Sequence, residues 1–289
     1  MNDSKWIWRF VSLVSIIATI IFIVGFGYAV KDIVNPQGDV PLTSLPQETV
    51  SPEGDAAEIL KVVALGDSLA KGTGDNTGNG FVKRAVSGML LDGGKVSLLG
   101  NLGINGLTTT GLQSELKEAG VKYTIRQANT ILVSIGGNDL FRGSGMSQSG
   151  NAGPDSAASA PSEASGNGSA AAKEEMTPES LLAALPEASK RLGALLQQIS
   201  EINPEAKVYY LGLYNPFGDI PEMQVPGNQA VTVWNNAAME IINRHSNMTL
   251  VPTFDLFHNH LEKYLSSDHY HPSGEGYQRI ADRIIQAMR

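Results

Sequence analysis

The chain has 289 residues, which is enough for one medium-sized domain with additional segments. Its net charge of −8 argues against nucleic acid as the main partner, because a phosphate backbone requires a basic surface. The chain contains no cysteine, which excludes disulfides, thiolate metal ligands, a cysteine nucleophile and a lipid anchor on cysteine.

Residues 1–30 have the composition of a transmembrane signal anchor. Phe10–Val30 is almost wholly apolar and carries no charge, and a helix needs about 20 such residues to cross a bilayer. Lys5 and Arg9 precede this run, so the positive-inside rule places the N-terminus in the cytoplasm and the rest of the chain outside the cell. A cleaved signal peptide is the alternative, but the apolar run exceeds the roughly 7–15 residues that such peptides use.

Two further segments have compositions that do not support a packed core. Residues 31–57 hold several prolines among glycine, serine and acidic residues, and are predicted to form an extended linker. The remaining residues, 58–289, are predicted to form one domain. Within it, residues 143–176 are mostly Ser, Ala and Gly without an aromatic residue, which predicts a disordered insertion. We favour a tolerated surface insertion over a lid, because long loops cost little to close.

Short valine-rich runs alternate with amphipathic segments along the predicted domain. Strands are predicted at Lys61–Gly66, Lys95–Leu99, Thr130–Ile135, Lys207–Leu213 and, more weakly, Leu250–Thr253. Helices are predicted at Phe81–Leu91, Thr109–Ala119, Pro178–Glu201, Val231–His245 and Gly276–Met288. This alternation predicts an α/β fold with a mainly parallel sheet between two helical layers, a three-layer α/β/α sandwich.

Polar segments follow the first two predicted strands. Gly66–Leu69 reads GDSL, and the hydroxyl of Ser68 is expected in the crevice beyond the strand ends, where α/β proteins bind ligands. A helix N-cap is the plainer interpretation of this serine. In the second segment, Asn101–Thr109, Gly106 precedes a predicted helix, where a backbone N–H is suited to holding an oxyanion. A tight turn with a threonine cap explains the same pattern.

Two later segments carry a second set of polar side chains. Gly136–Asp139 follows the third predicted strand and offers the side-chain amide of Asn138 at the same sheet edge, although an ordinary turn has this composition too. Asp268–Pro272 reads DHYHP and precedes the final predicted helix. There His271 is suited to act as a general base toward the serine, and Asp268 to hold its imidazole. A polar loop with surface histidines is the alternative.

In this order the four segments resemble the SGNH hydrolase superfamily, also called GDSL lipases and esterases. The resemblance covers the whole predicted domain and implies a flavodoxin-like sandwich. The site residues that it implies are Ser68 as nucleophile, Asp268 and His271 as the rest of the triad, and Ser68, Gly106 and Asn138 as oxyanion hole. Gly106 is preferred to Gly103 because family members place this glycine before the threonine-bearing helix start. The G-x-S-x-G elbow of the α/β-hydrolases is absent.

Other polar residues receive structural interpretations. Asp67 and Asp139 are expected to bond to turn amides. A zinc site at the histidines is disfavoured, because His258 and His260 lie in an apparently helical stretch where residues i and i+2 do not share a face. Lys71–Asp75 lacks the spacing of a phosphate-binding loop. The resemblance implies no cofactor and no metal.

The sequence thus predicts a membrane-anchored serine esterase or lipase that cleaves carboxylic esters through an acyl-enzyme at Ser68. Its partners would be a small-molecule ester, lipid or acylated glycan, and the membrane. Two alternatives are an O-deacetylase of cell-wall or other glycans and a non-catalytic exported binding protein on the same fold. Tyr214–Val225, rich in proline and aromatic residues, is a candidate rim of the site or a plain ordered loop. Nothing in the sequence indicates the acyl chain length, the alcohol or the oligomeric state.

Overall fold

The chain divides into two units, Met1–Asp55 and Ala56–Arg289. The computed structural model describes residues 9, 14–15, 18–23, 26, 59–141 and 178–289. In the first unit the described residues are helical and exposed. No helix within the described ranges is long and apolar enough to cross a membrane. Most of the predicted anchor at 1–30, the linker at 31–57 and the insertion at 143–176 lie outside those ranges.

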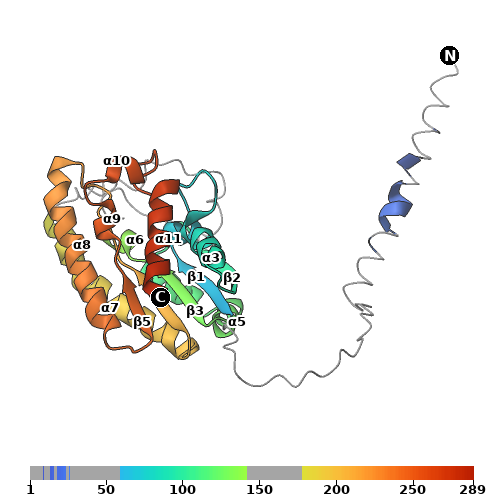
Figure 1. Cartoon of the computed structure of the whole chain (residues 1–289), viewed down its shortest axis with the longest axis horizontal. Coiled ribbons are helices and arrows are strands. Elements are labelled where there is room, and N and C mark those ends of the chain that lie inside the picture. Colours follow the sequence, from blue (N-terminus) through green and yellow to red (C-terminus); the bar gives the residue numbers. More distant parts are fainter. Residues whose placement is uncertain (1–8, 10–13, 16–17, 24–25, 27–58, 142–177) are drawn as a thin grey trace, which may run out of the picture. The chain divides into compact units, whose positions relative to one another are not determined.

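The second unit is built on a five-stranded parallel sheet with the order β2-β1-β3-β4-β5 (Figure 1). Its strands are β1 (Leu60–Gly66), β2 (Val96–Gly103), β3 (Thr130–Ser134), β4 (Lys207–Leu211) and β5 (Met248–Val251). The order reverses at β1, which pairs with β2 on one side and with β3 on the other. The crevice beyond the carboxyl ends of β1 and β3 is therefore the place where such a sheet binds ligands.

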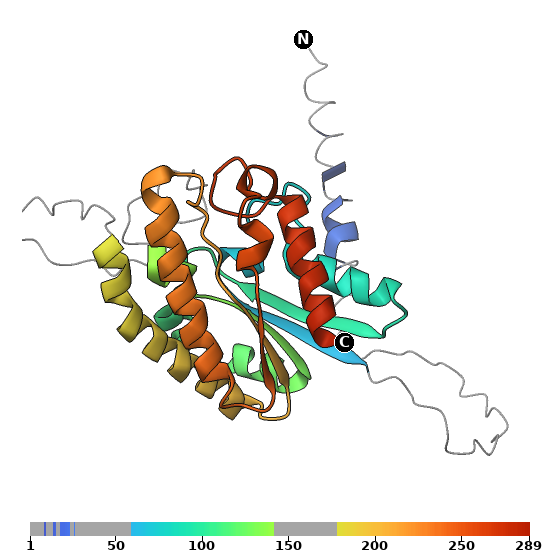
Figure 2. The same ribbon diagram turned by 60° about the vertical axis from the view of Figure 1, so that its left-hand side comes forward.

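Helices cover both faces of this sheet (Figures 1 and 2). They are α2 (Ser68–Lys71), α3 (Gly80–Leu91), α4 (Thr109–Glu115), α5 (Ala119–Gln127), α6 (Gly137–Phe141), α7 (Pro178–Ile202), α8 (Pro221–Ile242), α9 (Phe254–Phe257), α10 (Leu261–Tyr264) and α11 (Gly274–Met288). Alternate strand residues point to opposite faces. Val63 and Leu65 of β1 pack with α4, α5, α7 and α8, whereas Val62 and Ala64 pack with α3 and α11. The predicted three-layer α/β/α fold is confirmed.

The sequence placed the end of β2 and the helix after it incorrectly. The predicted strand Lys95–Leu99 extends to Gly103, so the first residues of the Asn101–Thr109 segment belong to the strand and do not follow it. An edge strand tolerates such polar residues because one side remains open to water. The predicted helix Thr109–Ala119 is two helices, α4 and α5, because Glu118 adopts an extended conformation between them.

The connection between β4 and α8 is shorter than the predicted rim loop. Helix α8 begins at Pro221, ten residues before the predicted start at Val231, so the last part of Tyr214–Val225 is helical. Pro221 occupies the first turn, where its missing N–H costs nothing and its fixed φ suits the helix. Pro221 is therefore compatible with a helix start, whereas Pro216 lies in the connection before α8.

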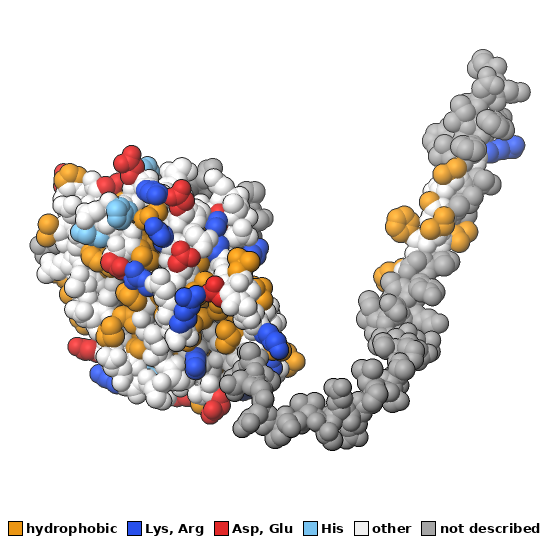
Figure 3. Space-filling model, in the orientation of Figure 1, with side chains coloured by type: hydrophobic (Ala, Val, Ile, Leu, Met, Phe, Trp, Pro, Cys, Tyr) orange, Lys and Arg blue, Asp and Glu red, His pale blue; other side chains and the backbone are white. Residues whose placement is uncertain are grey.

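The surface of the second unit carries both signs of charge. On the face in Figure 3, Lys and Arg side chains are interspersed with Asp and Glu among apolar ones. The coloured side chains of this face form no broad basic area that would suit a phosphate backbone.

Candidate active site

Ser68 lies directly beyond the carboxyl end of β1. The strand ends at Gly66, whose φ is +138° and whose Cβ, if it had one, would lie 1.9 Å from the carbonyl oxygen of Ser134. Only glycine fits there. Asp67, and not Ser68, is the N-cap of α2, because its Oδ1 accepts the N–H of Leu69 at 3.0 Å. Ser68 is then the first residue of α2, with only 4% of its surface exposed.

The loop between α10 and α11 carries the proposed acid and base on one tight turn. His269 has a φ of +52°, a left-handed conformation that reverses the chain between Asp268 and Tyr270. Oδ1 of Asp268 accepts the backbone N–H groups of Tyr270 and His271, each at 2.9 Å, and the hydroxyl of Ser266 at 2.8 Å. The carboxylate thus holds the loop that presents the histidine.

Three side chains far apart in sequence form a continuous chain of hydrogen bonds. Nδ1 of His271 donates to Oδ2 of Asp268 at 2.6 Å, and the Ser68 hydroxyl lies 2.8 Å from Nε2 of His271. With Nδ1 carrying the proton, Nε2 is free to accept from the hydroxyl. The structure therefore brings Ser68, His271 and Asp268 together in the arrangement of a nucleophile, its base and an orienting acid.

The carboxyl of Asp268 is held in its charged form. Partial burial alone would raise its pKa, but hydrogen bonds from the His271 ring, from two backbone N–H groups and from Ser266 lower the pKa well below its usual value. A permanently charged Asp268 favours the imidazolium that forms when His271 takes up a proton.

The proposed oxyanion donors lie on the neighbouring strand ends. Asn138, in α6 after β3, lines the same pocket as Ser68. Its Nδ2 donates one hydrogen to the Leu107 carbonyl at 2.9 Å, which fixes the amide and leaves a second N–H for a substrate. Gly106 precedes that carbonyl and has a φ of +73°, a conformation that favours glycine. The hydrogen bond of Asn138 thus joins the segment after β3 to the segment that contains Gly106, but only Asn138 is among the residues that line the pocket at Ser68.

Asp67 and Asp139 hold backbone segments of the site. Asp139 accepts the N–H and the hydroxyl of Thr109, at 2.8 and 2.6 Å, which fixes the start of α4 beside α6. Asp67 accepts the hydroxyl of Ser134 at 3.0 Å in addition to its capping bond. Burial raises the pKa of Asp67 to about 6, although hydrogen bonds from Leu69 and Ser134 partly oppose the rise.

Three supporting residues lie outside the polar motifs, although Tyr214 belongs to the segment that the sequence indicated as a candidate rim of the site. Ser134 is a buried strand-end serine whose role appears only through its contact with Asp67. Tyr214 donates its hydroxyl to the Tyr270 carbonyl at 2.8 Å and so ties the β4–α8 connection to the catalytic loop. Tyr277 of α11 donates likewise to the Thr73 carbonyl at 2.7 Å. The spacing of apolar residues in the last helix could have indicated that Tyr277 is buried, but not that it makes this hydrogen bond.

The four clustered histidines do not form a shared site. Residues 258–260 lie between α9 and α10, so the expected helical geometry was wrong. His258 stacks on Phe254 and His260 packs edgewise on Tyr264, whereas His271 belongs to the triad. Within the part of the chain that the structure describes, no three His, Asp or Glu residues are grouped to hold a metal ion.

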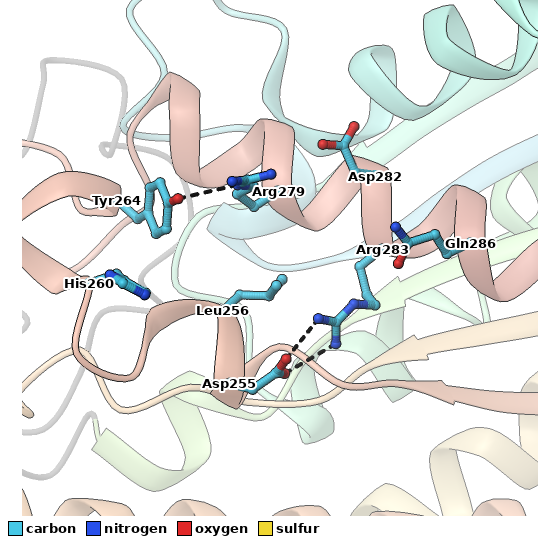
Figure 4. A pocket seen from close by; sticks show the side chains of 8 residues that line it. All are labelled: Asp255, Leu256, His260, Tyr264, Arg279, Asp282, Arg283 and Gln286. Carbon is cyan, nitrogen blue, oxygen red and sulfur yellow. Dashed lines mark hydrogen bonds and ion pairs between the residues drawn. The ribbon is translucent and has the colours of Figure 1, made fainter.

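A larger groove between α9–α10 and α11 lies apart from the triad (Figure 4). Its volume is about 260 Å³, and its guanidinium groups are already engaged. Arg283 forms two hydrogen bonds with Asp255, and Arg279 donates to the Tyr264 hydroxyl. None of its lining residues is a serine or threonine beside a base. Of these two pockets, only the smaller one holds a serine that is hydrogen-bonded to a histidine, Ser68.

Comparisons with known proteins agree with this geometry. Curated relatives include YpmR of Bacillus subtilis, an uncharacterized protein that is 27% identical over 240 residues, covering 82% of this chain and 84% of YpmR. The spore germination lipase LipC of Bacillus licheniformis is 25% identical over 236 residues, covering 79% and 96%. Among solved structures, the lipase Lip_vut3 from a goat rumen metagenome superposes with a TM-score of 0.62 at 25% identity, covering 79% and 97%.

The family model for the GDSL-like lipase/acylhydrolase family matches residues 64–279, a span that begins in β1 and ends in α11. This span includes the strand-end serine, both oxyanion segments and the Asp–His turn. The chain therefore belongs to the GDSL-like lipase/acylhydrolase family, the SGNH hydrolases, and is a hydrolase that acts on ester bonds.

Proposed function

We propose that the protein is a serine esterase that cleaves carboxylic esters through an acyl-enzyme at Ser68. The observation that carries the proposal is the hydrogen-bond chain from Ser68 through His271 to Asp268, with distances of 2.8 and 2.6 Å. Such a chain activates a hydroxyl that is otherwise a weak nucleophile.

In the first half-reaction the Ser68 oxygen attacks the ester carbonyl while Nε2 of His271 takes the hydroxyl proton. The negative oxygen of the tetrahedral intermediate is stabilised by N–H donors from Ser68, Gly106 and Asn138. Collapse of the intermediate expels the alcohol, which receives the proton from Nε2. Asp268 stabilises the imidazolium in both proton transfers.

In the second half-reaction water replaces the alcohol. Nε2 of His271 removes a proton from the water, whose oxygen attacks the acyl-enzyme. The same donors stabilise the second tetrahedral intermediate, and the Ser68 oxygen leaves with the proton that His271 returns. The products are the free acid and the restored hydroxyl.

Hydrolysis of 4-nitrophenyl esters tests this function. Ser68→Ala should lower kcat by more than about 10⁴-fold, as loss of a triad nucleophile does elsewhere. Ser97→Ala, a matched change at an exposed position of β2, should keep wild-type turnover. A wild-type protein that hydrolyses no ester would favour the non-catalytic binding protein, and turnover that survives Ser68→Ala would remove Ser68 as the nucleophile.

The proposal includes a place for the enzyme at the outer face of the cell membrane. Residues 1–30 would span the membrane with the N-terminus in the cytoplasm, 31–57 would act as tether, and 58–289 would form the extracellular hydrolase. The apolar composition of Phe10–Val30 supports this placement. So do residues Ile20–Ile23, which are helical and have exposed side chains.

Cell fractionation tests this placement. The full chain should remain with membranes after an alkaline wash, and a chain without residues 1–30 should be released. Protease should degrade the hydrolase domain when it is added to intact cells in which no outer membrane blocks its access. A soluble protein that starts near residue 30 would identify a cleaved signal peptide, and protection from protease would contradict the orientation.

A further inference from the structure

A small apolar pocket opens beside the nucleophile. Asp67, Ser68 and Asn138 form its polar side, and the remaining wall is mainly apolar and aromatic, from Leu69, Phe141, Leu213, Tyr214, Pro216 and Tyr270. The pocket is open to solvent on one side, and the cavity volume between these described residues is about 20 Å³. A single water needs roughly 10–15 Å³ by the same measure, and ligand pockets for larger molecules usually offer about 300–1,000 Å³.

The position of this pocket relative to the triad identifies the half of the ester that enters it. The alcohol oxygen of the substrate must lie at Nε2 of His271, because it receives its proton there. The pocket is lined by Ser68 and by the oxyanion donor Asn138, but not by His271. The substituent that points into it is therefore the acyl group, while the alcohol leaves on the histidine side.

Ring contacts and a hydrogen bond fix the walls of the pocket. Phe141 is 1% exposed and packs edge-on against Phe217 with ring centroids 5.4 Å apart. Phe217 in turn contacts Tyr270 at 5.9 Å. Tyr214 stacks on Phe257 at 4.0 Å while its hydroxyl bonds to the Tyr270 carbonyl. Enlarging the pocket would require several packed rings to move together, which dense packing opposes.

We propose that this pocket is an acetyl-sized acyl subsite and that the enzyme selects short-chain, above all acetyl, esters. Phe141 of α6 and Leu69 of α2 both contribute to its wall. The inference rests on the proposed function, since it assigns the acyl half of an ester attacked by Ser68. The substrates that it predicts are acetylated alcohols and not long-chain lipids.

The test compares kcat/KM for 4-nitrophenyl acetate, butyrate and octanoate. In the wild-type full chain, acetate should exceed octanoate by at least about tenfold, because seating the longer acyl chain would force the densely packed rings of the pocket apart. Phe141→Ala should raise the octanoate-to-acetate ratio by about 15-fold, since the removed ring makes room for two or more methylenes.

A matched control separates pocket size from general loosening. Phe81→Ala removes an equally buried ring from the opposite core, next to α11, and should leave the chain-length ratio unchanged. Leu69 is only half-buried, so Leu69→Ala provides the same enlargement test if Phe141→Ala fails to fold. In that variant the ratio should shift in the same direction.

The outcomes distinguish this inference from the proposed function. Octanoate hydrolysis equal to or faster than acetate hydrolysis, still abolished by Ser68→Ala, would overturn the acetyl-sized subsite and leave the serine esterase intact. An unchanged ratio in both Phe141→Ala and Leu69→Ala would also overturn the subsite. Ester hydrolysis that does not require Ser68, or no hydrolysis at all, would overturn both proposals.

Discussion

The buried carboxyl of Asp67 makes a sharp prediction about stability and pH. The residue lines the same pocket as Ser68 and is 3% exposed, and burial raises its pKa from 3.8 to about 6. Because the folded pKa lies above the unfolded one, the folded protein binds more protons between these two values. Stability from this group is therefore greatest below about pH 4 and falls as the pH rises to about 6.

The magnitude follows from the size of the shift. A difference of about two pKa units corresponds to roughly 3 kcal/mol, at about 1.4 kcal/mol for each unit. Asp67→Asn removes the titration but keeps an oxygen that accepts from Leu69 and Ser134. The free energy of unfolding of this variant, relative to wild type, should therefore rise by about 3 kcal/mol between pH 4 and pH 7.

Urea titrations at a series of pH values measure this difference, with the fluorescence of the fully buried Trp234 as the probe. Ser134→Ala serves as the control, because it removes one hydrogen bond from Asp67 but keeps the titrating carboxyl. It should retain the loss of stability with rising pH. Parallel curves for wild type and Asp67→Asn from pH 4 to 7 would refute the reasoning.

Three further substitutions test two residues of the candidate site and one buried carboxylate outside it. Asn138→Ala should lower kcat by about 100–1,000-fold with little change in KM, because the lost donor acts on the oxyanion, and a near-normal kcat would exclude it. Asp268→Asn should lower kcat by about 10³–10⁴-fold through the wrong His271 tautomer, and an unchanged circular dichroism spectrum would exclude unfolding as the cause. Burial would raise the pKa of Asp75, but hydrogen bonds, including those from Arg84, lower it to about 2. Its stabilisation is present above about pH 4 and lost as the pH falls toward 2. In urea titrations Asp75→Asn should therefore be less stable than wild type at pH 7 but nearly equal at pH 2, and equal stability at pH 7 would contradict the role of this carboxylate.

The polar segments of the candidate site could be located in the sequence because each is local. Ser68, Asn138 and the turn from Asp268 to His271 are short polar motifs placed after strands or before a helix, and the parallel sheet brings strand ends to one edge. Periodicity of apolar residues located the five strands and, at least in part, the helices α3, α4, α7, α8 and α11. The described helices α2, α5, α6, α9 and α10 were not predicted.

What the sequence missed depends on contacts between distant segments. The extension of β2 to Gly103 follows from its pairing with β1, which apolar periodicity does not reveal. The contact of Ser134 with Asp67 joins residues 67 positions apart. The non-helical stretch at 258–260 includes Asn259, with a φ of +63°, although the apolar spacing around it is helical. Local propensity does not encode such tertiary constraints.

Covalent labelling of the nucleophile tests the central claim most directly. A fluorophosphonate probe should form one adduct, which peptide mass spectrometry should locate on Ser68, with loss of esterase activity in step with labelling. His271→Ala should label far more slowly, because the base that activates the hydroxyl is missing. Activity that survives complete labelling of Ser68, or an inactivating adduct on a different residue, would contradict the serine mechanism.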